Sequence, residues 1–85
     1  MTIWKFPLAV TDVQDVPMPA DAQVASVQLQ GGQLMAWALV SPDAPIVNRR
    51  FRVIGTGNPV PDVAMTYRGS VQMGLFVWHV FEEHS

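Results

Sequence analysis

Proline and glycine interrupt this chain too often for a long helix to form. The six glycines and seven prolines are spread from position 7 to position 74, and the longest stretches without either, Ala20–Gln30 and Leu75–Ser85, are eleven residues. In a helix interior, each glycine costs roughly 1 kcal/mol and each proline roughly 3 kcal/mol. Short strands joined by turns remain. We therefore expect an all-β fold: a small antiparallel sandwich or partly open barrel of six to seven short strands.

The arginine-rich stretch 49–59 shows the clearest strand pattern. Phe51 and Val53 would share one face of a strand, and Arg50, Arg52 and Ile54 would share the other, because successive side chains leave opposite faces. The stretch ends in a glycine-rich turn. This pattern predicts a central or nearly central strand with charged side chains on one side.

Other stretches predict where the remaining strands lie. Thr2–Leu8 alternates, and its Pro7 predicts an edge strand because proline cannot donate to a ladder. Gln33–Ser41 is apolar on both faces, which is typical of a strand at the centre of a sheet or at an interface. Gly31-Gly32 before it is a two-residue hairpin signal, because both glycines accept positive φ.

Aromatic residues gather near both termini. Trp4 and Phe6 lie in the first predicted strand, and Phe76, Trp78 and Phe81 lie in the last. Pairing of these two strands would bring the rings together, and each cross-strand pair contributes roughly 0.2–1 kcal/mol. We therefore hypothesise that Thr2–Leu8 and Leu75–Phe81 are neighbours in one sheet. In the sequence between these two strands, we expect a bulge at Gly69. We also expect a short helical turn at Asp62–Thr66.

The composition limits the classes of function. Eighty-five residues make a single domain, 1–85. Its apolar content of 49% is high and its charged content of 14% is low, which together leave more apolar surface than one small core can hide, so we expect a homo-oligomer, most simply a dimer. The chain has no cysteine, and His79 and His84 are poorly placed to share a metal, so no metal site is expected. A net charge of -2 disfavours general nucleic-acid binding, and no apolar run is long enough to span a membrane.

The arginines and the turn after them are the candidate binding site. Arginine forks bind phosphates and carboxylates, and glycines let backbone N–H groups approach an anion. The turn lacks the third glycine of a dinucleotide loop and the Lys-Ser/Thr of a Walker loop, so a purely structural role stays open for both features. In that alternative the glycines only form a turn, and the arginines are solvated or paired with the acids of the chain. The candidate residues are Arg49, Arg50, Arg52, Thr56, Gly57, Asn58 and Arg68.

No catalytic residue can be picked out. His79 lies between Trp78 and Val80, and no nucleophile or orienting carboxylate stands at a recognised spacing from it. A packed or hydrogen-bonded histidine is the better interpretation. Trp4, Trp37 and Trp78 are candidates for a core or subunit interface, or for stacking on a ligand. We expect a protein that is not an enzyme and uses no cofactor.

Four stretches together resemble a family of small uncharacterised proteins of bacteriophages and prophages. They are Ile3–Leu8, Trp37–Pro45, Arg50–Pro59 and Phe76–Phe81. Members of the family resemble IWKFPL, then WALVDPDAP, then RxFxxxGTGHP, then VWHVFE, in this order over nearly the whole chain. Ser41 and Asn58 stand where Asp and His are typical. The resemblance brings no established activity.

The phage setting that this resemblance implies favours binding over catalysis. The expected function is that of a phage accessory protein in the host cytoplasm, blocking a host protein and in particular a host defence. A structural or assembly component of the virion is one alternative. A sponge for a small signalling nucleotide, held by the arginines, is another.

Overall fold

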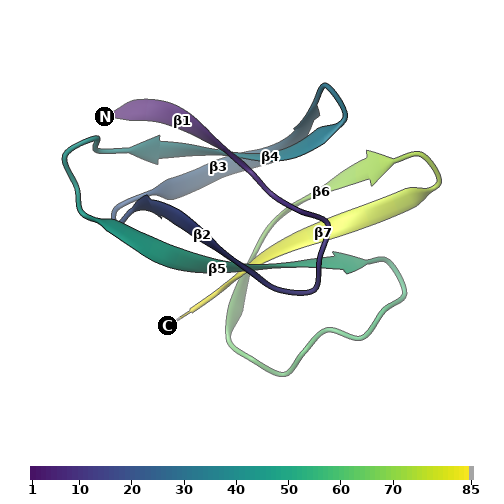
Figure 1. The fold of residues 1–85 in the computed structure, drawn as a ribbon. Coiled ribbons are helices and arrows are strands. Elements are labelled where there is room, and N and C mark those ends of the chain that lie inside the picture. The colour runs from purple at the N-terminus through teal and green to yellow at the C-terminus, as the bar shows by residue number, and fades with distance from the viewer. Residues whose placement is uncertain (85) are drawn as a thin grey trace.

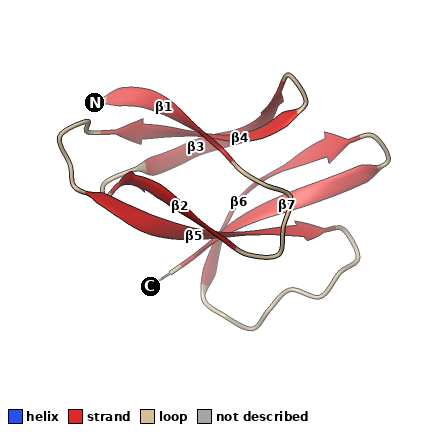
Figure 2. Ribbon diagram, viewed as in Figure 1, coloured by secondary structure: helices blue, strands red, loops and turns tan. Residues whose placement is uncertain are grey.

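The computed structural model describes residues 1–84, which form seven strands in two sheets and no helix (Figures 1 and 2). The strands are β1 Thr2–Pro7, β2 Gln14–Pro19, β3 Gln23–Gln30, β4 Gln33–Val40, β5 Ile46–Gly55, β6 Met65–Met73 and β7 Phe76–Glu83. A three-stranded sheet has the order β1-β4-β3, a four-stranded sheet has the order β2-β5-β7-β6, and all neighbours are antiparallel. The predicted all-β sandwich or open barrel is confirmed. Residues 1–84 offer no helix with the length and hydropathy needed to cross a membrane.

The three-stranded sheet is built around β4, as its two apolar faces predict. β4 lies between β1 and β3, and its residues Leu34, Ala36, Ala38 and Val40 are buried against the second sheet. The turn before it is the expected hairpin, with φ of 56° and 78° at its two glycines. β1 is an edge strand, as its proline predicts.

The four-stranded sheet carries the arginine-rich strand at an internal position. β5 lies between β2 and β7, with Phe51 and Val53 in the core and Arg50 and Arg52 on the outer face. Phe51 is fully buried, and a side chain of this size contributes roughly 1.5–3 kcal/mol when it leaves water. The core spans both sheets and comprises Leu8, Val16, Met18, Ala22, Val27, Leu34, Ala36, Ala38, Val40, Phe51, Val53, Val71 and Val80.

Two expectations about the rest of the chain are wrong. The first and last strands are not paired, because β1 pairs with β4 in one sheet while β7 pairs with β5 and β6 in the other. Both edges of β7 are thus occupied by strands closer to it in sequence. No helical turn forms at Asp62–Thr66, because Met65 and Thr66 already belong to β6 and pair with β7.

Four of the segments that connect the strands lie at one end of the sandwich (Figure 1). β1, β3, β5 and β6 end there, and β2, β4 and β7 begin there. This end therefore carries the segments 8–13, 31–32 and 74–75 and the start of segment 56–64. We call it the hairpin end.

Candidate binding site

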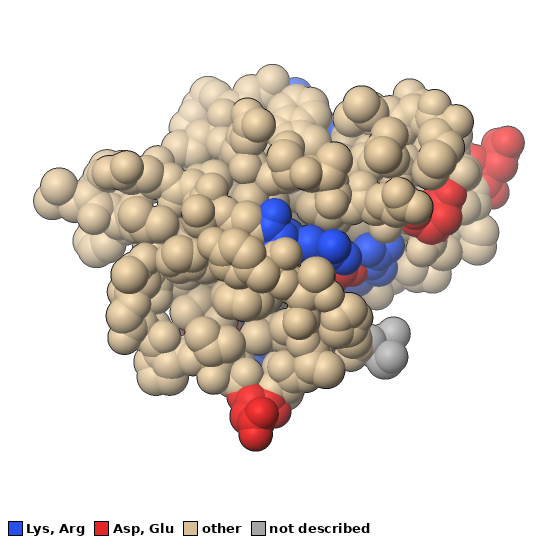
Figure 3. All heavy atoms as spheres, turned by 180° about the vertical axis from the view of Figure 1, so that it is seen from behind, with Lys and Arg blue, Asp and Glu red and all other residues tan. Residues whose placement is uncertain are grey.

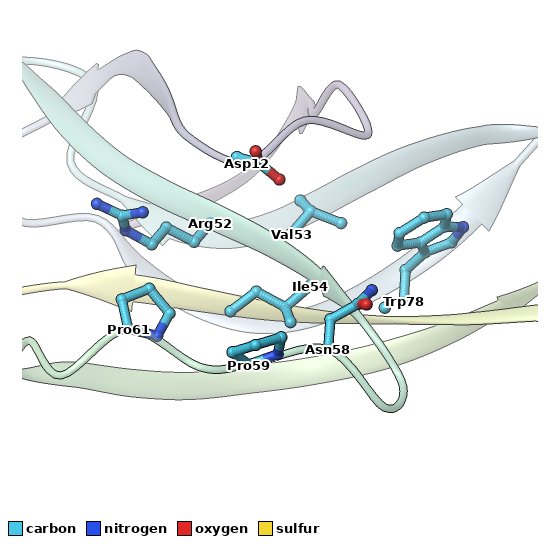
Figure 4. Close-up of a pocket in the computed structure, with 9 residues that line it drawn as sticks. Asp12, Arg52, Val53, Ile54, Asn58, Pro59, Pro61 and Trp78 are labelled. Atoms are coloured by element: carbon cyan, nitrogen blue, oxygen red, sulfur yellow. The ribbon is translucent and has the colours of Figure 1, made fainter.

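A trough runs along the edge of β5 at the hairpin end (Figure 4). β5 continues to Gly55, whereas β2 pairs with it only as far as Phe51, so no strand covers the next four residues on that side. The trough has a volume of about 380 Å³, within the range of small-ligand sites. Its lining residues are Asp12, Arg52, Val53, Ile54, Gly55, Asn58, Pro59, Pro61 and Trp78.

The glycine-rich turn shapes one end of this trough. The Asn58 N–H donates to the Gly55 carbonyl at 3.1 Å, and Gly57 has a φ of 92°. A Cβ on Gly55 would lie 2.9 Å from Asn58 Nδ2 and 3.1 Å from Trp78 Cζ3. Glycine at position 55 therefore lets the Asn58 amide and the Trp78 ring approach the strand. Figure 4 shows both side chains near the end of β5.

The turn is not arranged as an anion cradle. The Thr56 N–H donates to the Val77 carbonyl at 3.1 Å, and the Asn58 N–H donates to Gly55. Two N–H groups that a phosphate would need are thus engaged within the protein. The geometry favours the structural-turn alternative for Gly55–Asn58.

The arginines are paired with acids and lie in separate places. Arg50 donates to Asp15 at 2.9 Å on the outer face of the four-stranded sheet, and this hydrogen bond lowers the pKa of Asp15. Arg52 lines the trough and donates to Glu83 at 2.6 Å. On the face drawn in Figure 3, most of the visible Lys and Arg atoms form a short band near the middle of the molecule, with a few Asp or Glu atoms beside it.

Arg49 and Arg68 face the interior instead. Both donate to Glu82, whose side chain is buried, and Arg68 Nη2 lies 2.8 Å from Glu82 Oε1. Burial alone would raise the pKa of Glu82, but the hydrogen bonds from the two guanidinium groups outweigh it and lower that pKa. Two cations share one carboxylate, so this Arg49–Glu82–Arg68 cluster ties β5, β6 and β7 together.

The three tryptophans do not form one surface. Trp78 lines the trough, with Phe76 at a ring-centroid distance of 6.0 Å. Trp37 lies on the outer face of the three-stranded sheet, below the Lys5 ammonium. Trp4 lies on β1, which is an edge strand. Of the ten candidate residues, the trough brings together Arg52, Asn58 and Trp78.

A chain of hydrogen bonds centred on His79 lies beside the trough, and the spacing of its residues in the sequence did not predict it. His79 Nε2 lies 2.7 Å from Thr56 Oγ1, and His79 Nδ1 lies 2.8 Å from Tyr67 Oη. The three residues surround a second hollow of about 280 Å³ together with Ile54 and Phe81. Both ring nitrogens of His79 have hydroxyl partners, which agrees with a hydrogen-bonded histidine. Tyr67 reaches the ring because β6 and β7 pair in a register that shifts after Tyr67, which the sequence does not specify.

Comparison with known proteins gives a family and nothing beyond it. No curated protein and no solved structure matches the chain. One family model matches residues 1–85, the full length of the sequence. The chain therefore belongs to the family described as a domain of unknown function, DUF7352.

Proposed function

We propose that this protein acts by binding another protein through its hairpin end. In the form we favour, it is a bacteriophage accessory protein in the host cytoplasm that blocks a host protein, as an antagonist of host defence. The phage setting rests on the sequence resemblance described above. The binding surface rests on the tip of the hairpin between β6 and β7.

Leu75 at this tip is the observation that carries the proposal. Gly74, with a φ of 61°, and Leu75 form a two-residue turn between the paired residues Met73 and Phe76. The Leu75 side chain is 97% exposed and Phe76 is 65% exposed. A tight turn of this kind is ordinarily polar, so two large apolar side chains there favour a contact with a partner.

The surroundings of the tip suit such a contact. Val10 and Val13, in the segment between β1 and β2 at the same end, are also exposed. Phe76 is held against Trp78, so its ring loses little conformational freedom when a partner binds. Loops at one end of a β-sandwich are a common place for binding residues, because the sheets hold them rigidly.

The test compares two variants with a matched control. Leu75→Ser and Phe76→Ser remove exposed apolar groups at the hairpin end, and Ile46→Ser removes one that is 59% exposed at the far end of β5. Tagged proteins are recovered from infected cells, and the co-purified host proteins are quantified by mass spectrometry. We expect the first two variants to lose their partner at least tenfold, which corresponds to about 1.4 kcal/mol, and Ile46→Ser to keep it.

Two outcomes would overturn this proposal. One is that all three variants keep the same partners at the same level as the wild type. The other is that the pure protein turns over a substrate. Recovery of the protein in stoichiometric amount from purified virions would support the alternative of a structural component.

The trough supports a second candidate function, the sequestration of a small nucleotide. Trp78 offers a ring for stacking, Asn58 an amide for a base edge, and Arg52 a guanidinium group for a phosphate. Arg52 would have to exchange Glu83 for the ligand. Thermal shift with cyclic nucleotides tests this, since ligand at a hundredfold its Kd adds about 2.7 kcal/mol. Arg52→Ala should abolish the shift, and an unchanged melting temperature of the wild type would refute the idea.

A further inference from the structure

Among the residues that the structure describes, the edge of β1 is regular, and its only proline, Pro7, stands at the end of the strand. Edge strands invite pairing with other chains unless prolines, bulges or a covering element block them. β2 contains Pro17 and Pro19. β3 and β6 each contain a register shift, and these two edges lie against each other. β1 pairs without a shift along its whole length.

The free backbone groups of β1 belong to Ile3 and Lys5. The Leu8 N–H donates to the Leu34 carbonyl of the strand that β1 pairs with. In an antiparallel ladder, alternate residues point their N–H and C=O groups to the same side. The even residues of β1 therefore bond to β4, and the odd residues face outward. Pro7, which has no N–H, is also at an outward position, so it breaks no bond within the sheet.

The side chains of this edge leave it open. Ile3 is 62% exposed on one face of the sheet, and Trp4 is 39% exposed on the other. Lys5 is the residue that would ordinarily discourage pairing. Its ammonium group donates to Gln30 at 2.7 Å and lies 5.8 Å from the centroid of the Trp37 ring. The charge is thus drawn over the outer face of the sheet and away from the edge.

We propose that β1 pairs with β1 of a second copy of this chain, antiparallel and centred on Trp4, to form a continuous six-stranded sheet. In this register Ile3 of each copy lies opposite Lys5 of the other, and the two Trp4 side chains meet across the two-fold axis. About four backbone hydrogen bonds link the copies. The contact is isologous, as in most dimers.

Charge and proline chemistry select this register over those centred on Lys5 and on Phe6. Pairing centred on Lys5 places two like charges directly opposite each other, which is destabilising. Pairing centred on Phe6 places Lys5 opposite Pro7, which has no N–H to give. Centring on Trp4 avoids both and uses the outward groups of Ile3 and Lys5 fully. The occupant is a second copy because the edge complements itself in this register.

The absence of cysteine from the chain makes the geometry directly testable. Trp4→Cys places the only thiols of the dimer opposite each other at a position without hydrogen bonds, where Cα atoms lie about 4.5 Å apart, within disulfide range. Asp43→Cys, in the exposed turn after β4, is the control for random collision. Under mild oxidation, we expect Trp4→Cys to form a covalent dimer at least tenfold faster than Asp43→Cys.

Two further variants fix the register. Lys5→Cys alone should not crosslink, because the two Lys5 residues are not opposite each other. A mixture of Ile3→Cys and Lys5→Cys proteins should give the mixed dimer, because those positions face each other at about 5.5 Å between Cα atoms. Crosslinking of Lys5→Cys with itself at the rate of Trp4→Cys would overturn the register.

The unmodified protein gives an independent readout. Sedimentation velocity should show a dimer at tens of micromolar, and Ile3→Lys, which places like charges opposite each other across the two copies, should be monomeric with an unchanged far-ultraviolet spectrum. A wild-type monomer across that range, with equal crosslinking of Trp4→Cys and Asp43→Cys, would overturn the proposal. Leu75→Ser should dimerise like the wild type. Loss of the β1 dimer can therefore be distinguished from loss of partner binding at the hairpin end.

Discussion

Gly69 of β6 lies against Val27 of β3, so closely that a Cβ on Gly69 would come within 2.6 Å of Val27 Cγ2. Its φ of 146° and the register shift between Tyr67 and Gly69 show that the bulge expected at Gly69 is formed, with Arg68 as the extra residue. The bulge also brings the edges of the two sheets together, where β3 and β6 contact each other. The absence of a side chain at position 69 therefore lets β3 and β6 pack together on this side of the sandwich.

Replacing that glycine should weaken the fold. Gly69→Ala forces Val27 aside and also places an L side chain at a positive φ, so we expect a loss of about 2–3 kcal/mol in the free energy of unfolding. Urea denaturation measures it. Gly57→Ala is the control, because Gly57 has a positive φ but no heavy atom within 4 Å of its Cβ position, and it should lose about 1 kcal/mol. Equal losses would show that the contact with Val27 contributes nothing.

A second prediction concerns the Arg49–Glu82–Arg68 cluster. Glu82→Gln leaves two guanidinium groups without their carboxylate in a partly buried place. Breaking a buried ion pair costs roughly 3–5 kcal/mol, and since both arginines keep some contact with solvent we expect about 2 kcal/mol. Asp15→Asn, which breaks an exposed pair, should change the urea midpoint little. The prediction fails if the two variants are equally stable.

The same cluster should set the response of the protein to acid. The folded state holds the pKa of Glu82 below its ordinary value of 4.5, so the unfolded state takes up the proton first as pH falls. The stabilisation is therefore complete above the unfolded pKa and is lost as pH falls from about 4.5 through the folded pKa. Urea denaturation at several pH values from 7 down to 3 should show this loss. Glu82→Gln should have a flatter profile, whereas a profile identical to that of the wild type would contradict the assignment.

A fourth prediction concerns the trough. Gly55→Ala should displace the Asn58 amide and the Trp78 ring, because its Cβ would fall within 3.1 Å of both. The φ of Gly55 is not in the left-handed region, so the fold should remain. We expect the amide signal of Asn58 and the indole signal of Trp78 to move in a two-dimensional NMR spectrum, with the core signals unchanged. If the Trp78 indole and Asn58 signals do not move, the close approach of these two side chains to position 55 does not require glycine.

Much of the fold could be predicted from local patterns. Alternation located the strands, Gly31-Gly32 located a hairpin, and Pro7 located an edge, because each depends on residues close together in sequence. The division into two sheets could not be predicted in the same way. Aromatic rings at both termini would also suit pairing of the first and last strands. The partner of β1 is instead set by the edge of β4, which pairs with β1 from Thr2 to Pro7.

The candidate site was predictable only in part. Arg52, Asn58 and Trp78 do line one trough, but Arg49 turns inward to Glu82. Strand parity carries a signal for this, since Arg49 is two residues from Phe51 and so shares its face. The positions of Arg68 and Tyr67 depend on the bulge at Gly69, and a bulge reverses the facing of every residue beyond it. Pairing with acids distant in sequence follows from the sheet register and is not visible in a run of arginines.

Site-specific crosslinking is the sharpest test of whether the hairpin end binds a partner protein. A photo-reactive phenylalanine derivative is placed at Leu75 and, as the control, at Asp43 in the turn after β4. After irradiation of infected cells, we expect one dominant host protein covalently attached at position 75 and none at position 43. Attachment of the same protein at both positions, or at position 43 alone, would contradict it.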